Sequence, residues 1–300
     1  MTIDLNLIKD EYPFTPQTFK INGEKLSYLD EGPRDAHTIV MLHGNPTWSF
    51  YYRKLVLALR DRFRVIVPDH MGCGLSSKPQ NYNYSLSTHI HNLRKLLTRL
   101  KIDDMTLAIH DWGGAIGMGY AVDNPQKVKS LVIFNTAAFI FNWAPSRILA
   151  LKAPLVGDFL MRGLNVFSRA AIDFKMATAK PERFTETVRT GYLAPYNSWK
   201  NRAAVCAFVK DIPMSPAHPS YALLRSIDDR LYYFRNTPAI FFWGEKDFCF
   251  DLRFLTEWKN RLDNTESHVL EDAGHLVVED AHEKIVPLLN SFLENVYSAK

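Results

Sequence analysis

Three residues with the side chains of a catalytic triad follow separate β-rich runs of this chain. Asp111 and Asp247 come shortly after apolar runs that are typical of buried strands, and His275 follows an expected strand near 265–270. A nucleophile, an imidazole base and an acid that orients the base are the parts that covalent catalysis needs. Since sites of parallel sheets lie beyond the carboxyl ends of the strands, we expect these three side chains to meet there.

The residues around Asp111 predict that it is the nucleophile. A strand that runs straight into a helix start rich in small residues is typical of the nucleophile elbow, usually written G-x-S-x-G. Asp111 occupies the serine position, and Gly113 and Gly114 let the helix pack close behind the turn. The order nucleophile, acid, histidine along the chain is also the one that α/β-hydrolases use.

A carboxylate in this position changes the reaction. Serine attacks a carbonyl, whereas a carboxylate can displace a leaving group from a saturated carbon and remain as an alkyl ester. His275 can then activate water against the ester, with Asp247 orienting the imidazole. The backbone N–H groups of Asn45 and Trp112 would form the oxyanion hole, and their side chains, both neutral donors, would hold the departing group.

The segment HDWG (110–113) resembles the elbow of haloalkane dehalogenases and epoxide hydrolases. Epoxide hydrolases usually have an aromatic residue in place of Asn45, and fluoroacetate dehalogenases an arginine in place of Trp112. One dehalogenase branch carries its acid after the sixth strand, where this chain has Asn135. The resemblance therefore implies that Asp247, after the seventh strand, is the acid, as in the third haloalkane dehalogenase subfamily.

Longer stretches resemble the β-lactone decarboxylases of bacterial long-chain olefin biosynthesis. These stretches are HGNPTWSFYYRKLV, PDHMGCGLSSKP, YNSWKNRAAV and FVKDIP. The resemblance implies that a cis-β-lactone becomes an olefin and CO2, with Asp111 attacking the ring carbon that bears the lactone oxygen. Haloalkane dehalogenation is the alternative, and an epoxide hydrolase or a non-catalytic ligand receptor on the hydrolase fold is less favoured. Alkyl chain length, stereochemistry and the role of His275 without an attacking water stay open.

The elements that must position these residues alternate along the chain. An opening hairpin turns at Asn22-Gly23, the dipeptide best suited to a tight primed turn. Apolar strands that alternate with helices then predict a parallel sheet covered on both faces. The expected strands are 38–43, 63–68, 105–110, 128–134, 238–243 and 265–270, and the expected helices are 51–60, 85–101, 113–125, 251–261 and 277–297.

Residues 136–235 interrupt this alternation with helix-like stretches that prolines separate. A helical block set inside a parallel sheet predicts a cap. We therefore expect an α/β-hydrolase fold with a mostly parallel eight-stranded sheet, a core of residues 1–135 and 236–300, and a helical cap of residues 136–235 inserted after strand 6. The cap is rich in Phe, Leu, Met and Trp, which suits a substrate with long alkyl chains.

Composition narrows the remaining possibilities. Apolar residues make up 47% and charged residues 23%, and the scattered charges of net +4 give no footprint for nucleic acid. Cys73, Cys206 and Cys249 lack the spacing of a disulfide framework or a zinc site. Without a signal peptide or a membrane-spanning run, we expect a cytoplasmic enzyme without metal or cofactor. Its expected ligand is a small hydrophobic substrate, and the resemblance adds a possible homo-oligomer or complex with other olefin-pathway enzymes.

Some residues have a second interpretation. Glu245 or Asp272 can replace Asp247 as the acid, and His43 can support the elbow. His89 and His91 stand on different faces of one helix, which argues against a metal site. Three tyrosines can either mimic the cap tyrosines of epoxide hydrolases or simply pack: Tyr192, Tyr196 and Tyr221.

Overall fold

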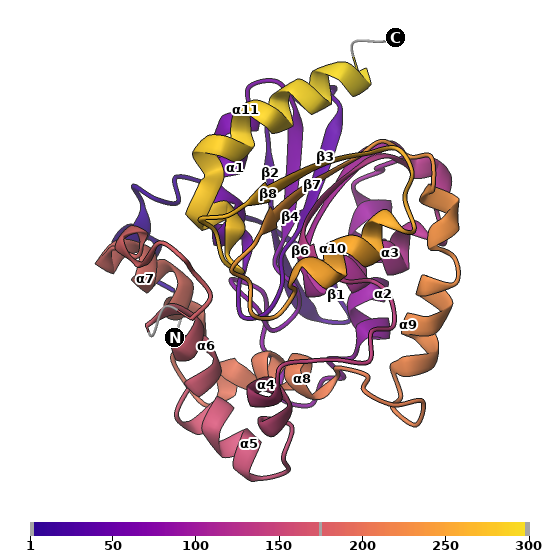
Figure 1. Cartoon of the computed structure of the whole chain (residues 1–300). Coiled ribbons are helices and arrows are strands. Elements are labelled where there is room, and N and C mark those ends of the chain that lie inside the picture. The colour runs from indigo at the N-terminus through magenta and orange to yellow at the C-terminus, as the bar shows by residue number, and fades with distance from the viewer. Residues whose placement is uncertain (1–2, 174–175, 298–300) are drawn as a thin grey trace.

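The computed structural model describes residues 3–173 and 176–297, which form an eight-stranded sheet (Figure 1). The strand order is β1-β2-β4-β3-β5-β6-β7-β8, with β1–β2 and β2–β4 antiparallel and all other pairs parallel. The strands are β1 Gln17–Ile21, β2 Glu24–Glu31, β3 Thr38–Leu42, β4 Arg64–Pro68, β5 Met105–Asp111, β6 Val128–Thr136, β7 Ala239–Gly244 and β8 Thr265–Leu270. The predicted fold class and all six expected strands are confirmed.

The opening hairpin turns as its sequence predicts. Asn22 and Gly23 both have positive φ, at 50° and 86°, and Ile21 pairs with Glu24. Positive φ at both central residues is the geometry of the primed turn that matches strand twist.

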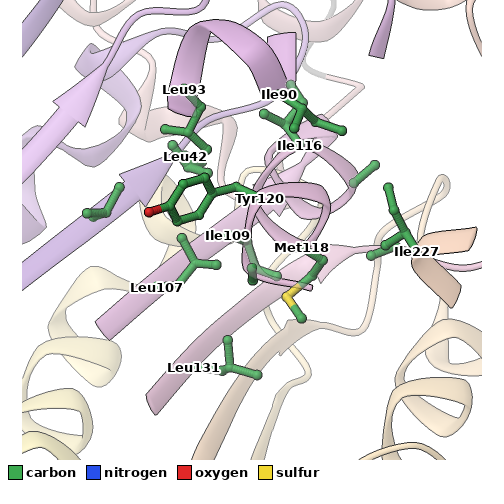
Figure 2. Packing of buried hydrophobic residues seen from close by; sticks show 14 of the residues in the cluster. Leu42, Ile90, Leu93, Leu107, Ile109, Ile116, Met118, Tyr120, Leu131 and Ile227 are labelled. Atoms are coloured by element: carbon green, nitrogen blue, oxygen red, sulfur yellow. The ribbon is translucent and has the colours of Figure 1, made fainter. Parts of the chain in front are cut away.

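Helices cover both faces of the sheet, as continuous apolar strands require. Side chains of β5 point alternately to the two faces of the sheet and so belong to two separate cores. Leu107 and Ile109 pack toward α2 and α3, whereas Ala108 packs toward α1 and α11. Figure 2 shows the first of these cores, in which Leu107 and Ile109 of β5 belong to the same cluster as Ile116 of α3. The helices of the core are α1 Arg53–Leu59, α2 Leu86–Arg99, α3 Trp112–Ala121, α10 Leu252–Lys259 and α11 Val277–Tyr297.

The described residues between β6 and β7 form helices that turns and loops connect, without a strand. The α-helices of this segment are α4 Ser146–Ala150, α5 Val156–Asp158, α6 Val166–Ile172, α7 Glu186–Leu193, α8 Ala203–Lys210 and α9 Tyr221–Asp228, and η4 Phe159–Gly163 is a π-helix. Helices α4, α5, α6 and α8 lie beyond one end of the strands, and α7 lies next to α6 (Figure 1). Helix α9 returns to the core, where Ile227 packs close to Gly119 of α3.

Short 3-10 helices complete the chain: η1 Leu5–Ile8, η2 Ser49–Tyr52, η3 Pro125–Lys127, η5 Pro181–Arg183, η6 Ala194–Tyr196, η7 Lys200–Arg202 and η8 Leu231–Phe234. Within the described ranges, no helix is both long and apolar enough to cross a membrane. The same residues contain no group of three or more His, Cys, Asp or Glu side chains that could hold a metal ion. Cys73, Cys206 and Cys249 are free thiols.

Candidate active site

Asp111 lies at the sharp turn between β5 and α3. Its φ of 50° and ψ of −125° are unusual for a residue with a side chain, and such a backbone costs about 1–3 kcal/mol. The surroundings hold it there: the Thr136 hydroxyl donates to the Asp111 carbonyl, and a Cβ atom at Gly113 would collide with the Leu42 carbonyl. The turn therefore has the strained geometry of a nucleophile elbow.

Backbone donors surround the Asp111 carboxylate. The Asn45 N–H donates to Oδ1 at 2.6 Å, and the Trp112 N–H also bonds the carboxylate. A Cβ atom at Gly44 would overlap Oδ1, so the loop can approach this closely only with glycine at that position. Burial raises the pKa of Asp111 above its ordinary value, while His275 and the two N–H groups oppose the rise. These are the two N–H groups that the sequence predicts for an oxyanion hole.

His275 lies between two carboxylates. Its Nδ1 is 2.8 Å from Asp247 Oδ2, and its Nε2 is 3.8 Å from Asp111 Oδ2. Burial works against a charged imidazole, but the carboxylates of Asp247 and Asp111 outweigh it and raise the pKa of His275 to about 9. The ring is therefore oriented by Asp247 and faces Asp111 with its other nitrogen.

The structure shows which of the three candidate acids contacts His275. Asp247 is 3% exposed and bonds both His275 and the Cys249 N–H. Asp272 instead pairs with Lys180 and Lys284, and Glu245 is exposed to solvent. The imidazole therefore meets Asp247 and neither alternative.

Asn135 fixes the loop that carries Asp247, a contact that the sequence analysis missed. Its Nδ2 donates to the carbonyls of Gly244 at 3.1 Å and Phe250 at 3.2 Å, and its Oδ1 accepts the Gly244 N–H at 2.8 Å. The amide thus joins the end of β6 to both ends of the loop between residues 244 and 250. One indication of this contact was present in the sequence: Asn135 stands after the sixth strand, where one dehalogenase branch has its catalytic acid.

Two further histidines form hydrogen bonds to backbone groups near the site. His110 Nε2 lies 2.9 Å from the His275 carbonyl. His43 Nδ1 lies 2.8 Å from the Gly44 carbonyl, and its Nε2 accepts the His70 N–H. His43 therefore supports the loop that carries Asn45, beside the elbow where the sequence suggested such a role.

The side chains of Asn45 and Trp112 line one cavity with Asp111 and His275. Asn45 Nδ2 donates to the Val205 carbonyl of α8, while its Oδ1 is buried without a partner among the described residues. The half-buried Trp112 indole N–H makes no hydrogen bond within the part of the chain that the structure describes. A free donor is therefore available beside the carboxylate.

The cavity has a volume of about 360 Å³ and mostly apolar walls. Its lining includes Phe139, Trp143, Ile148, Phe167, Val209 and Phe248. This lining suits alkyl groups, with the polar atoms gathered around Asp111.

The three tyrosines that could mimic those of epoxide hydrolases do not reach the cavity. Tyr192 donates to Glu279 at 2.9 Å, Tyr196 donates to the Thr47 carbonyl at 3.0 Å, and neither these two nor Tyr221 lines the cavity. Of the two helix histidines, His89 stacks on Phe208 in the interior and His91 is exposed, so they lie on different faces as predicted.

Comparisons with known proteins agree with this architecture. The model of the alpha/beta hydrolase fold family matches residues 37–281. The cis-3-alkyl-4-alkyloxetan-2-one decarboxylase of Shewanella oneidensis is 42% identical, over 94% of this chain and 89% of that protein. Haloalkane dehalogenase 2 of Mycobacterium tuberculosis is 32% identical, over 95% of this chain and 97% of that protein.

Solved structures show the same fold. A haloalkane dehalogenase from Bradyrhizobium elkani USDA94 superposes with a TM-score of 0.87 at 20% identity, covering 96% of this chain and all of that one. The chain therefore belongs to the α/β-hydrolase fold family and, within it, to the group of enzymes that includes cis-3-alkyl-4-alkyloxetan-2-one decarboxylases and haloalkane dehalogenases.

Proposed function

We propose that this enzyme is a cis-β-lactone decarboxylase, which converts a dialkyl oxetan-2-one to an olefin and CO2 with Asp111 as nucleophile. The observation that carries the proposal is the Asp111 carboxylate, set on a strained turn in an apolar cavity and faced by the His275–Asp247 pair. The higher identity to the decarboxylase, 42% against 32% for the dehalogenase, favours this substrate class.

The first step follows from the two different environments of the Asp111 oxygens. Oδ1 is held by the Asn45 N–H, whereas Oδ2 faces His275 across 3.8 Å. We assign the attack to Oδ2, which forms a C–O bond to the ring carbon as the lactone C–O bond breaks. The electron pair of the broken bond goes to the departing carboxylate, which the side-chain donors of Asn45 and Trp112 would receive.

The second step regenerates the enzyme. The bond to the carboxylate carbon breaks, its electron pair forms the C=C bond, and the ester C–O bond breaks to restore the Asp111 carboxylate. No water, proton or redox partner is consumed. The apolar walls favour loss of a charged carboxylate as neutral CO2. A His275 that is protonated at neutral pH would stabilise Asp111 as the group that leaves, which gives the imidazole a role without an attacking water.

Haloalkane dehalogenation is the second candidate, and one observation favours it. The free Trp112 N–H and the Asn45 amide stand beside Asp111, where a departing halide would need neutral donors. In that reaction His275 would activate a water that attacks the carbonyl carbon of the Asp111 ester. The regenerated Asp111 carboxylate would then contain one oxygen atom from solvent.

The two functions can be separated in ¹⁸O-labelled water. The purified enzyme is incubated with a cis-dialkyl β-lactone and, separately, with a dibromoalkane. We expect olefin and CO2 from the lactone, with no label in the peptide that contains residue 111. Label in that peptide, together with halide and alcohol as the main products, would instead assign the enzyme to dehalogenation.

A variant tests the proposed covalent intermediate. With the dibromoalkane, His275→Ala should accumulate an alkyl adduct on Asp111, because no base remains to activate water. Intact-mass and peptide analysis would locate the adduct. Asp111→Ala is the matched control, and turnover of the lactone by this control would contradict the assignment of the nucleophile.

The domain division and the cellular context are also proposals. We propose residues 136–235 as the cap and residues 1–135 with 236–300 as the core, because every regular element in the described part of the insertion after β6 is a helix. Similarity to an enzyme that acts on alkyl oxetanones supports a small hydrophobic substrate. A cytoplasmic location, self-association and complexes with enzymes that make the lactone belong to the same proposal.

A further inference from the structure

Exposed apolar side chains gather at the outer tip of the helical insertion. Leu155, Val156, Phe159 and Trp199 are 82%, 61%, 56% and 46% exposed, and together they are called the outer patch. The Phe159 N–H bonds the Leu155 carbonyl, and the rings of Phe159 and Trp199 both approach Gly163, so the members adjoin one another. Helix α5 carries part of the patch. In Figure 1 it lies at the lower edge of the view, far from α11.

Cations flank the outer patch. Lys200, which is exposed, follows Trp199 in the chain, and the Arg162 guanidinium lies 4.8 Å from the centre of the Trp199 ring. Lys152, three residues before the patch, is half-buried and donates to the Ile212 carbonyl. Among residues 3–173 and 176–297, none of these three forms an ion pair with a carboxylate. Asp158, the one acid between Lys152 and Leu164, pairs with Lys210. The patch is therefore an apolar surface with a positive border.

The layer beneath the patch forms a wall of the cavity. Ile148 of α4 and Leu151, which precede the patch, line the cavity, as do Val166 and Phe167 of α6, which follow it. One helical layer thus presents apolar side chains to the cavity on its inside and to solvent on its outside. Exposed apolar patches with a polar rim are typical of surfaces that bind a partner or a membrane.

We propose that the outer patch docks the enzyme on an anionic lipid bilayer, with Leu155, Val156 and Phe159 entering the interface. Large apolar side chains beside Trp and bordering cations are the features of interfacial membrane binding. A second copy of this chain is a poorer occupant, because a two-fold contact would bring the positive borders together. Docking does not depend on the proposed function; only its use, the uptake of a water-insoluble lactone from the lipid, rests on it.

Vesicle sedimentation tests the proposal. The full-length enzyme is mixed with vesicles of phosphatidylcholine alone or of phosphatidylcholine and phosphatidylglycerol in equal parts. We expect it to sediment with the anionic vesicles, and added salt should weaken this binding. Leu155→Ser/Val156→Ser/Phe159→Ser should lower the partition coefficient at least about tenfold, since it removes most of the inserted apolar area.

Two further variants serve as controls. Tyr232 is 61% exposed in η8, which leads into the start of β7, so Tyr232→Ser removes a comparable apolar group outside the patch and should bind as wild type. Lys200→Glu should lower binding to anionic vesicles by about fivefold or more and leave binding to neutral vesicles unchanged. Circular dichroism and turnover of a short-chain, water-soluble cis-β-lactone verify that each variant is folded and active.

Three results would overturn the proposal. The wild type does not sediment with either kind of vesicle; the triple variant sediments as well as wild type; or Tyr232→Ser loses as much binding as the triple variant. Light scattering coupled to gel filtration tests whether the patch instead binds a second copy of this chain. A wild-type oligomer that the triple variant dissociates, in the absence of vesicle binding, would assign the patch to self-association.

Discussion

Asp111, His275 and Asp247 form one buried cluster of charges in this protein, and Arg53 forms a second with Glu279. In the second cluster, Arg53 Nη1 and Nη2 lie 2.6 Å and 2.8 Å from the two oxygens of Glu279. Arg53 also donates to Glu11 and to the Phe50 carbonyl, and the Tyr192 hydroxyl donates to Glu279. Both clusters are almost completely withdrawn from solvent.

The clusters differ in how many of their hydrogen-bonding positions are filled. The guanidinium and carboxylate of the second cluster meet in a bidentate pair with further partners on each side, an arrangement that repays burial. In the first cluster, Asp111 Oδ2 stays 3.8 Å from His275 Nε2, and the Asp111 side chain lines the cavity. Buried charge that is fully paired holds elements together, whereas buried charge that keeps a free oxygen is available for chemistry.

Asp111→Asn should break the first cluster at its reactive end. The amide keeps the shape of the carboxylate but cannot attack, so we expect turnover of the lactone to fall at least about 10⁴-fold. Because burial raises the pKa of Asp111, removing its charge should leave the free energy of unfolding unchanged or slightly higher. Steady-state kinetics and urea unfolding would measure both, and a large loss of stability would contradict the comparison.

Arg53→Met should show the opposite pattern. It leaves Glu279 buried without its cation, which typically costs about 3–5 kcal/mol of stability. The double variant Arg53→Met/Glu279→Gln removes the orphaned charge and should recover part of the loss. We expect kcat of the folded fraction to stay near wild type, measured beside urea unfolding curves. A catalytic defect that the double variant does not relieve would show that the second cluster also serves the chemistry.

The pH dependence of stability should report the charge on His275. Its pKa in the folded protein is about 9, above the ordinary value of 6.5, so protonated His275 stabilises the native state. That contribution is complete below about pH 6.5 and is lost as the pH rises through 9, with a total of roughly 3 kcal/mol. The stability difference between wild type and His275→Gln isolates it. A difference that does not change with pH across this window would mean that the imidazole is neutral in the fold.

Patterns of adjacent residues allowed much of the fold to be predicted. Apolar strands, small residues behind Asp111 and the Asn22-Gly23 turn each act within a few positions of the chain. Contacts between distant segments were missed for a physical reason. Asn135 meets Gly244 across 109 positions and Arg53 meets Glu279 across 226, and nothing local to either partner encodes the other.

The acid shows the same limit within the site. Glu245, Asp247 and Asp272 all stand in loops after strands, and the sequence leaves the choice to a resemblance. Distance decides it in the structure, because Asp247 alone of the three bonds His275. The Asn45 and Trp112 side chains likewise contact α8: its Val205 carbonyl takes one hydrogen of the Asn45 amide, and the centre of its Phe208 ring lies 5.3 Å from that of the Trp112 ring.

Asn135→Ala should give the smallest of these effects. It should show whether Asn135 only stabilises the fold, as the second cluster does, or also positions a residue of the first cluster. The change removes three hydrogen bonds around the loop that presents Asp247, at a cost of about 1–3 kcal/mol. If the amide positions Asp247, the looser carboxylate should also let the pKa of His275 fall toward its ordinary value and reduce kcat by about tenfold. Stability measurements alone would not separate this role from simple support of the fold.

A matched variant makes the distinction. Asn92 is also buried, at 3% exposure, and bonds Tyr82 away from the site, so Asn92→Ala should lower stability without moving the pH profile. NMR titration of the His275 ring in both variants provides the readout. A His275 pKa near 9 in Asn135→Ala would show that the Asp247 loop keeps its place without the amide, and that the first cluster is positioned by its own bonds.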